Sequence, residues 1–230
     1  DLMQSIALEN NLSETAFINI NESPIPIRWF TPTLEVDLCG HATMASAKIL
    51  FEHFPDIAGS EISFSSKSGI LKVSKNAEDI CLNFPADDPE LQEMDALFAE
   101  ALGKSPIEIL RGTDDFLAVF ETEQQIQTMN PDFTKLAKIN SRGVVISAPG
   151  NDVDFVSRCF FPQTGVDEDP VTGSAHTMLI PYWAKQLNKI EFKAHQLSAR
   201  GGVLDCKLIH DRVLISGKSI IYFEGMISII

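Results

Sequence analysis

The sequence has little positive charge. Its 230 residues include 18 Lys and Arg against 32 Asp and Glu, which gives a formal net charge of −14. A field of that sign repels polyanions over long range. Neither nucleic acid nor an anionic membrane surface is therefore expected as a partner.

Long apolar runs and processing signals are also missing. No run approaches the roughly 18 apolar residues that a membrane span needs, and the first ten residues carry neither a basic region nor a cleavage pattern. The sequence thus predicts no membrane segment and carries no export signal.

Cysteine is scarce and scattered. The four cysteines form no CxxC pair: Cys39, Cys81, Cys159 and Cys206. This spacing argues against a disulfide scaffold and against a metal knuckle. A reducing, cytoplasmic location fits the pattern best.

What the sequence does contain is an internal repeat. The pattern R-x-F-x-P-x-x-x-V-D at Arg28–Asp37 recurs at Arg158–Asp167, at an offset of 130 residues. Further matches follow at an offset of 133 residues: Gly40 and Ala42 with Gly173 and Ala175, then Gly69 and Leu71 with Gly202 and Leu204. Collinear matches at nearly one offset predict two similar halves.

Each half is predicted to be a sheet wrapped around one helix. Apolar residues at helical spacing predict helices over Gly40–Phe54 and Gly173–Leu187, and Pro181 could kink the second. The β-rich runs after each helix predict strands at 61–65, 69–75 and 79–84, and at 190–197 and 202–210. The second half also opens with predicted strands at 107–110 and 116–120 and a short helix at 132–139, which corresponds to a helix at 1–8.

The repeat also predicts how the chain is divided. Pro85–Pro89 interrupts the strand pattern, and Glu90–Leu102 has the pattern of an amphipathic connecting helix. We expect a first lobe over residues 1–88, a second over 89–218, and C-terminal strands over 219–230 that could return to the first lobe. Residues 107–131 have no first-half counterpart, so the comparison predicts a strand region of about 25 residues ahead of the first half.

The starts of the two central helices are candidate anion sites. A helix start presents free backbone N–H groups and a positive dipole end, and Gly40 and Gly173 let a carboxylate approach closely. Ordinary capping by Ser, Thr or Asp is the alternative for either start. Two matched starts that face one cleft favour a carboxylate site.

Several titratable residues lie near these starts. His41 and His176 could serve acid/base chemistry or bind a metal, but no HxH or HExxH spacing occurs, so no metal site is predicted. The acidic run Asp167–Asp169 is either a solvated surface or a set of carboxyls beside a pocket. Glu14, in a turn before a strand, is either a surface glutamate or a proton carrier at the cleft.

Three segments together resemble a known family: Glu9–Phe17 (ENNLSETAF), Asp37–Thr43 (DLCGHAT) and Asp167–His176 (DEDPVTGSAH). They are similar to the PhzF-like family of phenazine-biosynthesis-type isomerases, which has the diaminopimelate epimerase fold. The resemblance spans nearly the whole chain and implies an α+β fold of two pseudo-symmetric lobes, each a curved, mostly antiparallel sheet around a central helix. Family members open with a strand and a Gly-Asn-Pro segment, ahead of the point where this sequence begins.

The resemblance also implies roles for particular residues. Glu14 would be the general acid/base, and His41, Asp169 and Ser174 would orient it and the substrate. The substrate-binding positions would be Gly40, Gly173, Thr172 and Ala42. It further implies proton transfer on a small, anionic, cyclic carboxylate without a cofactor, and a homodimer.

A two-thiol mechanism is less compatible with the sequence. Related racemases and epimerases use one cysteine from each lobe, whereas here Thr172 stands at the place that matches Cys39. A hydroxyl is too weakly acidic to replace a thiol in that role, so Cys39 is expected to be a buried small hydrophobe. An amino-acid epimerase or dehydratase on this scaffold, or a binding protein without catalysis, remain the alternatives.

Overall fold

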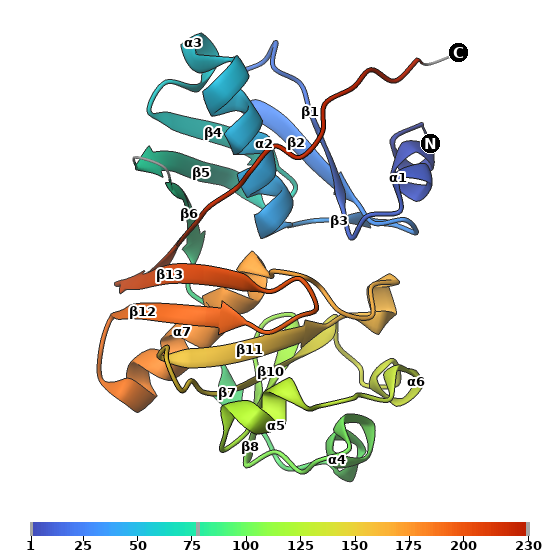
Figure 1. Ribbon diagram of the computed structural model, residues 1–230, viewed down its shortest axis with the longest axis vertical. Helices are drawn as coiled ribbons and strands as arrows, with labels where there is room; N and C mark the ends of the chain where they lie inside the picture. Colours follow the sequence, from blue (N-terminus) through green and yellow to red (C-terminus); the bar gives the residue numbers. More distant parts are fainter. Residues whose placement is uncertain (1, 77–78, 229–230) are drawn as a thin grey trace.

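The computed structural model describes residues 2–76 and 79–228 (Figure 1). The first half contains α1 (Leu2–Asn10), β1 (Thr15–Ile18), β2 (Ile25–Phe30), β3 (Glu35–Val36), α2 (Gly40–His53), α3 (Pro55–Ala58), β4 (Glu61–Ser66), β5 (Gly69–Asn76) and β6 (Asp79–Pro85). The second half contains β7 (Glu90–Leu91), α4 (Ala96–Leu102), β8 (Glu108–Arg111), β9 (Asp115–Val119), α5 (Glu123–Gln127), α6 (Phe133–Leu136), β10 (Gly143–Pro149), β11 (Phe155–Phe160), the 3-10 turn Pro162–Thr164, α7 (Gly173–Leu187), β12 (Glu191–Gln196), β13 (Gly202–Ile209) and β14 (Arg212–Gly217).

The strands form one mostly antiparallel path. Its order is β1-β2-β4-β5-β6-β14-β13-β12-β11-β10-β9-β8-β7, and β3 pairs with β2. Parallel pairing occurs at β2/β4, β11/β12 and β9/β10. Figure 1 shows α2 beside β4 and β5 in one half and α7 beside β12 in the other. The architecture is α+β, as the sequence predicts.

The repeat is visible in three dimensions. The antiparallel pair β1/β2 and the parallel pair β2/β4 recur as β10/β11 and β11/β12. The matching strands β6 and β14 pair with one another and so join the two halves. The matched residues Arg28 and Arg158 each pair with a glutamate, with Arg28 Nε 2.8 Å from Glu35 Oε1 and Arg158 Nε 2.7 Å from Glu168 Oε1, although the two glutamates do not stand at matched positions of the repeat. The two halves are therefore related by pseudo-two-fold symmetry.

The two central helices are anchored in one buried core. Apolar side chains of α2, such as Leu50 and Phe51, and of α7, such as Met178 and Leu179, belong to the same cluster. A second cluster packs α4, α5 and α6 against the second-half sheet, and β10 is accordingly buried along all but its last residue. This shared core sets where the N-terminal ends of the two helices lie relative to one another.

The predicted helix ends are nearly right. The helix over Gly173–Leu187 is confirmed with both bounds, and Pro181 lies inside it without ending it. The other central helix, α2, stops at His53 because Phe54 caps it and Pro55 begins α3.

The predicted helix over Glu90–Leu102 is wrong in its first half. Glu90–Leu91 form β7, which pairs with β8, and α4 begins at Ala96. Asp95 fixes that start, because its side chain accepts a hydrogen bond from the N–H of Leu97 at 2.9 Å.

The predicted ends of the chain also need correction. Residues 218–228 contain no strand, and residues 229–230 lie outside the described part. A physical reason is that β14 already has hydrogen-bonded neighbours on both edges, β6 and β13. The predicted helices at 1–8 and 132–139 become α1, Leu2–Asn10, and α6, Phe133–Leu136, with Asp1 outside the described part. The division at residues 88 and 218, and the strand region ahead of the first half, stay predictions.

None of the helices within residues 2–76 and 79–228 is both long and apolar enough to cross a membrane.

Candidate active site

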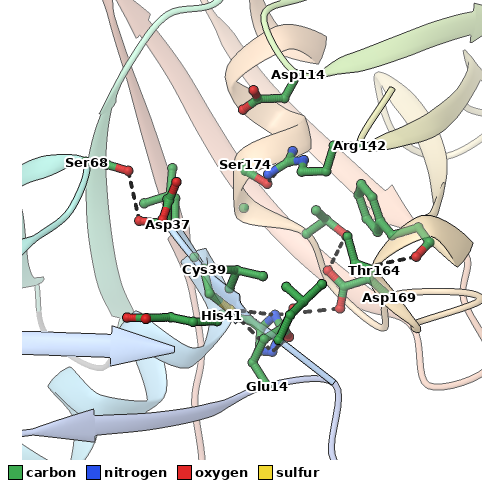
Figure 2. A pocket seen from close by; sticks show the side chains of 18 residues that line it. Glu14, Asp37, Cys39, His41, Ser68, Asp114, Arg142, Thr164, Asp169 and Ser174 are labelled. Carbon is green, nitrogen blue, oxygen red and sulfur yellow. Dashed lines mark hydrogen bonds and ion pairs between the residues drawn. The ribbon is translucent and has the colours of Figure 1, made fainter. Parts of the chain in front are cut away.

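A cavity of about 330 Å³ lies between the starts of α2 and α7. Figure 2 shows side chains from both halves converging on it. Seven of the eight predicted site residues line this cavity: Glu14, Gly40, His41, Asp169, Thr172, Gly173 and Ser174. The eighth, Ala42, is buried in the hydrophobic core and does not line the cavity.

The two helix starts touch at backbone level. A β-carbon on Gly40 would lie 2.8 Å from the Cα of Gly173, and one on Gly173 would lie 3.1 Å from the Cα of Gly40. The N-cap residues Cys39 and Thr172 make no side-chain capping hydrogen bond. The cavity thus faces two helix N-termini that no cap side chain satisfies, which is the arrangement that binds carboxylates.

Glu14, His41 and Asp169 form a row of acid, base and acid across the cavity (Figure 2). Glu14 Oε2 lies 3.1 Å from His41 Nε2, and Asp169 Oδ1 lies 3.6 Å from His41 Nδ1. Glu14 comes from the residue before β1, His41 from the first turn of α2, and Asp169 from the loop before α7. Residues distant in sequence are therefore joined by the meeting of the two halves.

The surroundings favour a positively charged His41. Burial lowers the pKa of this imidazole, but Cys39, Glu14 and Asp169 together raise it well above its ordinary value. A neutral imidazole has one N–H, whereas the two carboxylates here flank both ring nitrogens. An imidazolium at His41 therefore forms ion pairs with both Glu14 and Asp169.

Asp169 is held by a buried polar network. The hydroxyl of Thr172 donates to Asp169 Oδ2 at 2.5 Å, and Gln196 Nε2 donates to Thr172 Oγ1 at 3.0 Å. Gln196 also donates to the carbonyl of Asp169 at 2.8 Å and accepts from the N–H of Thr172 at 2.7 Å. Burial raises the pKa of the Asp169 carboxyl, which His41 and Thr172 offset in part. Gln196 was missed from the sequence, since a glutamine at a strand end belongs to no motif.

A second network holds Ser174 in the second-half wall. Arg142 Nη2 donates to Ser174 Oγ at 3.1 Å, and the same guanidinium binds both carboxylate oxygens of Asp115, one from Nε at 2.9 Å. Arg142 lines the cavity. It was also missed from the sequence, because it stands in a loop outside all three recognised segments.

Three other titratable residues near the helix starts, His176, Asp167 and Glu168, lie in surroundings unlike those of His41 and Asp169. His176 is fully buried outside the cavity, with Nδ1 2.8 Å from the carbonyl of Thr172, and burial lowers its pKa to about 4. Of the neighbouring acids, Asp167 is exposed and Glu168 is paired with Arg158. His176 is therefore a neutral structural residue. Neither Asp167 nor Glu168 lines the cavity as Asp169 does.

The cavity also holds the donor types of a metal site. Glu14, Cys39 and His41 bring a carboxylate oxygen, a thiol and a ring nitrogen within 4.8 Å of one another. Burial raises the pKa of the Cys39 thiol, and that of His41 is raised as well. A metal ion would have to displace both protons, so these donors fit proton chemistry better, and the absence of a metal stays a prediction.

The two matched lobes and the cavity between their helix starts define the diaminopimelate epimerase-like class of α+β proteins. A family model for phenazine biosynthesis-like proteins matches residues 1–225. An uncharacterized isomerase of Pseudomonas aeruginosa is 48% identical over 227 residues, which are 99% of this chain and 87% of the relative. The chain belongs to the phenazine biosynthesis-like, or PhzF-like, family of isomerases.

Solved structures agree with this assignment. A crystal structure of a PhzF family protein from Enterococcus faecalis matches with a TM-score of 0.93 and 43% identity, covering 99% of this chain and 87% of that one. A probable proline racemase from Agrobacterium radiobacter matches with a TM-score of 0.67 at 10% identity, covering 99% and 80%. The second likeness concerns the fold alone.

Proposed function

We propose that this protein is a cofactor-independent isomerase that moves a proton on a small cyclic carboxylate, with Glu14 as the general acid/base. The observation that carries the proposal is the contact of 3.1 Å between Glu14 Oε2 and His41 Nε2 inside the cavity that both helix starts face. A proton carrier has to stand within reach of the substrate before its pKa matters. That Glu14 lines the cavity supports this role.

Each part of the cavity has a task in this proposal. The starts of α2 and α7 bind the substrate carboxylate through backbone N–H groups. Glu14 takes a proton from one carbon and returns it to another, while the His41 imidazolium orients Glu14 and opposes the negative charge that builds up. Asp169, fixed by Thr172 and Gln196, holds the other side of the imidazole.

The surroundings of Thr172 argue against the epimerase alternative. A two-base epimerase needs a second proton carrier at that place, but the Thr172 hydroxyl already donates to Asp169 and accepts from Gln196. Its partner across the cavity, Cys39, is 5% exposed and has a raised pKa because it is buried. One carboxylate that both removes and returns the proton fits these residues better than two thiols.

The test is deuterium uptake from solvent. The chain is incubated in D₂O with a panel of hydroxylated cyclohexadiene carboxylates, and uptake is followed by mass spectrometry. We expect exchange into at least one member, reduced by a factor of about 100 or more in Glu14→Gln, because general acid/base groups contribute on that scale. The control is Glu22→Gln, the same chemical change at an exposed residue, which should leave exchange unchanged.

Two results would count against the proposal. Full exchange in Glu14→Gln would exclude Glu14 as the proton carrier. Binding of panel members without any exchange would favour a non-catalytic binding protein. A cytoplasmic location and a homodimer stay predictions.

A further inference from the structure

The cavity is short of positive charge. Its lining includes five carboxylates, from Glu14, Glu35, Asp37, Asp114 and Asp169, against two cationic side chains, His41 and Arg142. The charge of His41 is already flanked by Glu14 and Asp169, and Glu35 is paired with Arg28 and Lys67 outside the cavity. The whole chain carries a formal net charge of −14. A carboxylate that enters such a cavity meets like charges on several sides, so a local cation is needed to hold it.

Arg142 is held in a fixed orientation. Its Nε and Nη2 both donate to Asp115, whose side chain is 5% exposed, while its own side chain remains 27% exposed. The guanidinium also lies over the ring of Phe161, with its Cζ 5.3 Å from the ring centroid. Such a clamp leaves little rotamer freedom to lose when a ligand binds.

Part of the guanidinium remains free for a ligand. Within residues 2–76 and 79–228, no side chain or carbonyl accepts a hydrogen bond from Nη1 of Arg142. Its Nη2 donates to Ser174 Oγ at 3.1 Å, and Ser174 is the second residue of α7. Figure 2 shows the guanidinium pointing to Ser174, on the opposite side of the cavity from Glu14.

We propose that Arg142 is the specificity-determining residue of this cavity and binds the substrate carboxylate together with Ser174 and the start of α7. The inference rests on the proposed function and adds a charged side chain to the carboxylate site that the helix starts form. Because Nε and Nη2 are occupied by Asp115 and Ser174, the N–H groups of Nη1 are the donors left for a ligand. Their positive charge favours a carboxylate over a neutral amide of the same shape. The protein should therefore select substrates by a planar carboxylate at the second-half wall, opposite Glu14.

The test compares two flat probes of the same size, benzoate and benzamide, by NMR titration of the full chain. The wild type should bind benzoate more tightly than benzamide. Arg142→Met should weaken benzoate binding by about tenfold or more, the loss of one charged hydrogen-bond donor, and should leave benzamide binding unchanged. Arg142→Lys, which keeps the charge but not the fixed guanidinium, should recover part of the preference. Lys72→Met is the control, because it removes the same charge at a surface position away from the cavity.

The Arg142→Met variant needs a companion that does not leave a buried charge unpaired. Arg142→Met leaves the buried carboxylate of Asp115 without its partner, which could unfold the chain. The double variant Arg142→Met with Asp115→Asn removes both charges. A thermal melt is used to check that it is folded. It should show the same loss of preference for benzoate.

The inference is overturned if the folded variants keep the preference for benzoate, or if the wild type shows no preference. Either result leaves the proposed function standing as long as Glu14→Gln abolishes deuterium exchange. Glu14→Gln should keep benzoate binding, because Glu14 lies away from Arg142. Deuterium exchange in Glu14→Gln would contradict the proposed function, whatever the Arg142 variants show.

Discussion

Gly40 and Gly173 stand so close that a β-carbon on Gly40 would come within 2.8 Å of the Cα of Gly173. The contact lies where the first residues of α2 and α7 meet, one from each half of the repeat. Because two helix starts share one point, their positive dipole ends act on the same cavity. A glycine at position 40 is thus a geometric requirement of the site, and a β-carbon at position 173 would be tight, at 3.1 Å from the Cα of Gly40.

Gly40→Ala should separate the two helix starts. A separation of 2.8 Å is shorter than real β-carbon contacts, and the neighbour is backbone rather than a flexible side chain. We expect a loss of about 1–3 kcal/mol in the free energy of unfolding, typical of overpacking, together with weaker benzoate binding. Denaturant unfolding and titration measure both. In Gly217→Ala, the nearest atom to the new β-carbon is 3.6 Å away; an equal loss there would refute the argument.

The protonation of His41 should appear as a pH dependence of stability. Its pKa in the folded chain is raised, so its contribution to stability is fully present below the unfolded value, about 6.5, and is lost as the pH rises through the folded value. His41→Asn should lack this fall on the alkaline side. The measurement is the free energy of unfolding from pH 6 to 9, with ¹⁵N NMR of the imidazole.

A second histidine variant serves as the control for that prediction. His210 is exposed and has a left-handed backbone, with φ of 53°, which asparagine tolerates. His210→Asn should keep the alkaline fall. If the His41 ring titrates at or below its ordinary value, the imidazolium is not the resting form.

Cys39→Ala should keep most of the deuterium exchange. The thiol is buried and its pKa is raised, so it carries little thiolate at neutral pH. Removing it costs packing at the start of α2 but no proton carrier. Measured exchange within a few-fold of the wild type is expected, while a loss comparable to that of Glu14→Gln would revive a thiol mechanism.

Gln196→Leu should damage both stability and exchange. The change keeps the size of the side chain but leaves the buried N–H and hydroxyl of Thr172 and the carbonyl of Asp169 short of partners. Unsatisfied buried groups cost about 1–3 kcal/mol each, and Asp169 would lose its fixed position. Gln92→Leu, at an exposed position, is the control; unchanged exchange in Gln196→Leu would show that the network is not needed.

The repeat made much of the fold predictable from the sequence. The apolar residues at helical spacing placed the helix Gly173–Leu187, although Ala175–Trp183 turn out to be buried all round the helix and not on one face alone. The helix predicted from Glu90 failed because Glu90–Leu91 pair with β8, a contact between segments that periodicity does not register. The N-cap Asp95 was an available local signal for the true start at Ala96.

The candidate site was predictable mainly through the family resemblance. Glu14 is separated from Asp169 by more than half of the chain, and no local pattern states that both flank His41. Gln196 and Arg142 were missed because each depends on a partner from another element: Gln196 binds Thr172, and Asp115 holds Arg142. Such roles depend on how the sheet and α7 come together.

The most direct test of the central claim is the stereochemical course of proton transfer. A panel substrate that exchanges is labelled with deuterium on the donor carbon, and the product is analysed by NMR. A single carboxylate at Glu14 predicts that hydrogen is returned to the same face from which it left, with part of the deuterium carried over. Delivery to the opposite face, without any carry-over, would show two bases and contradict this account.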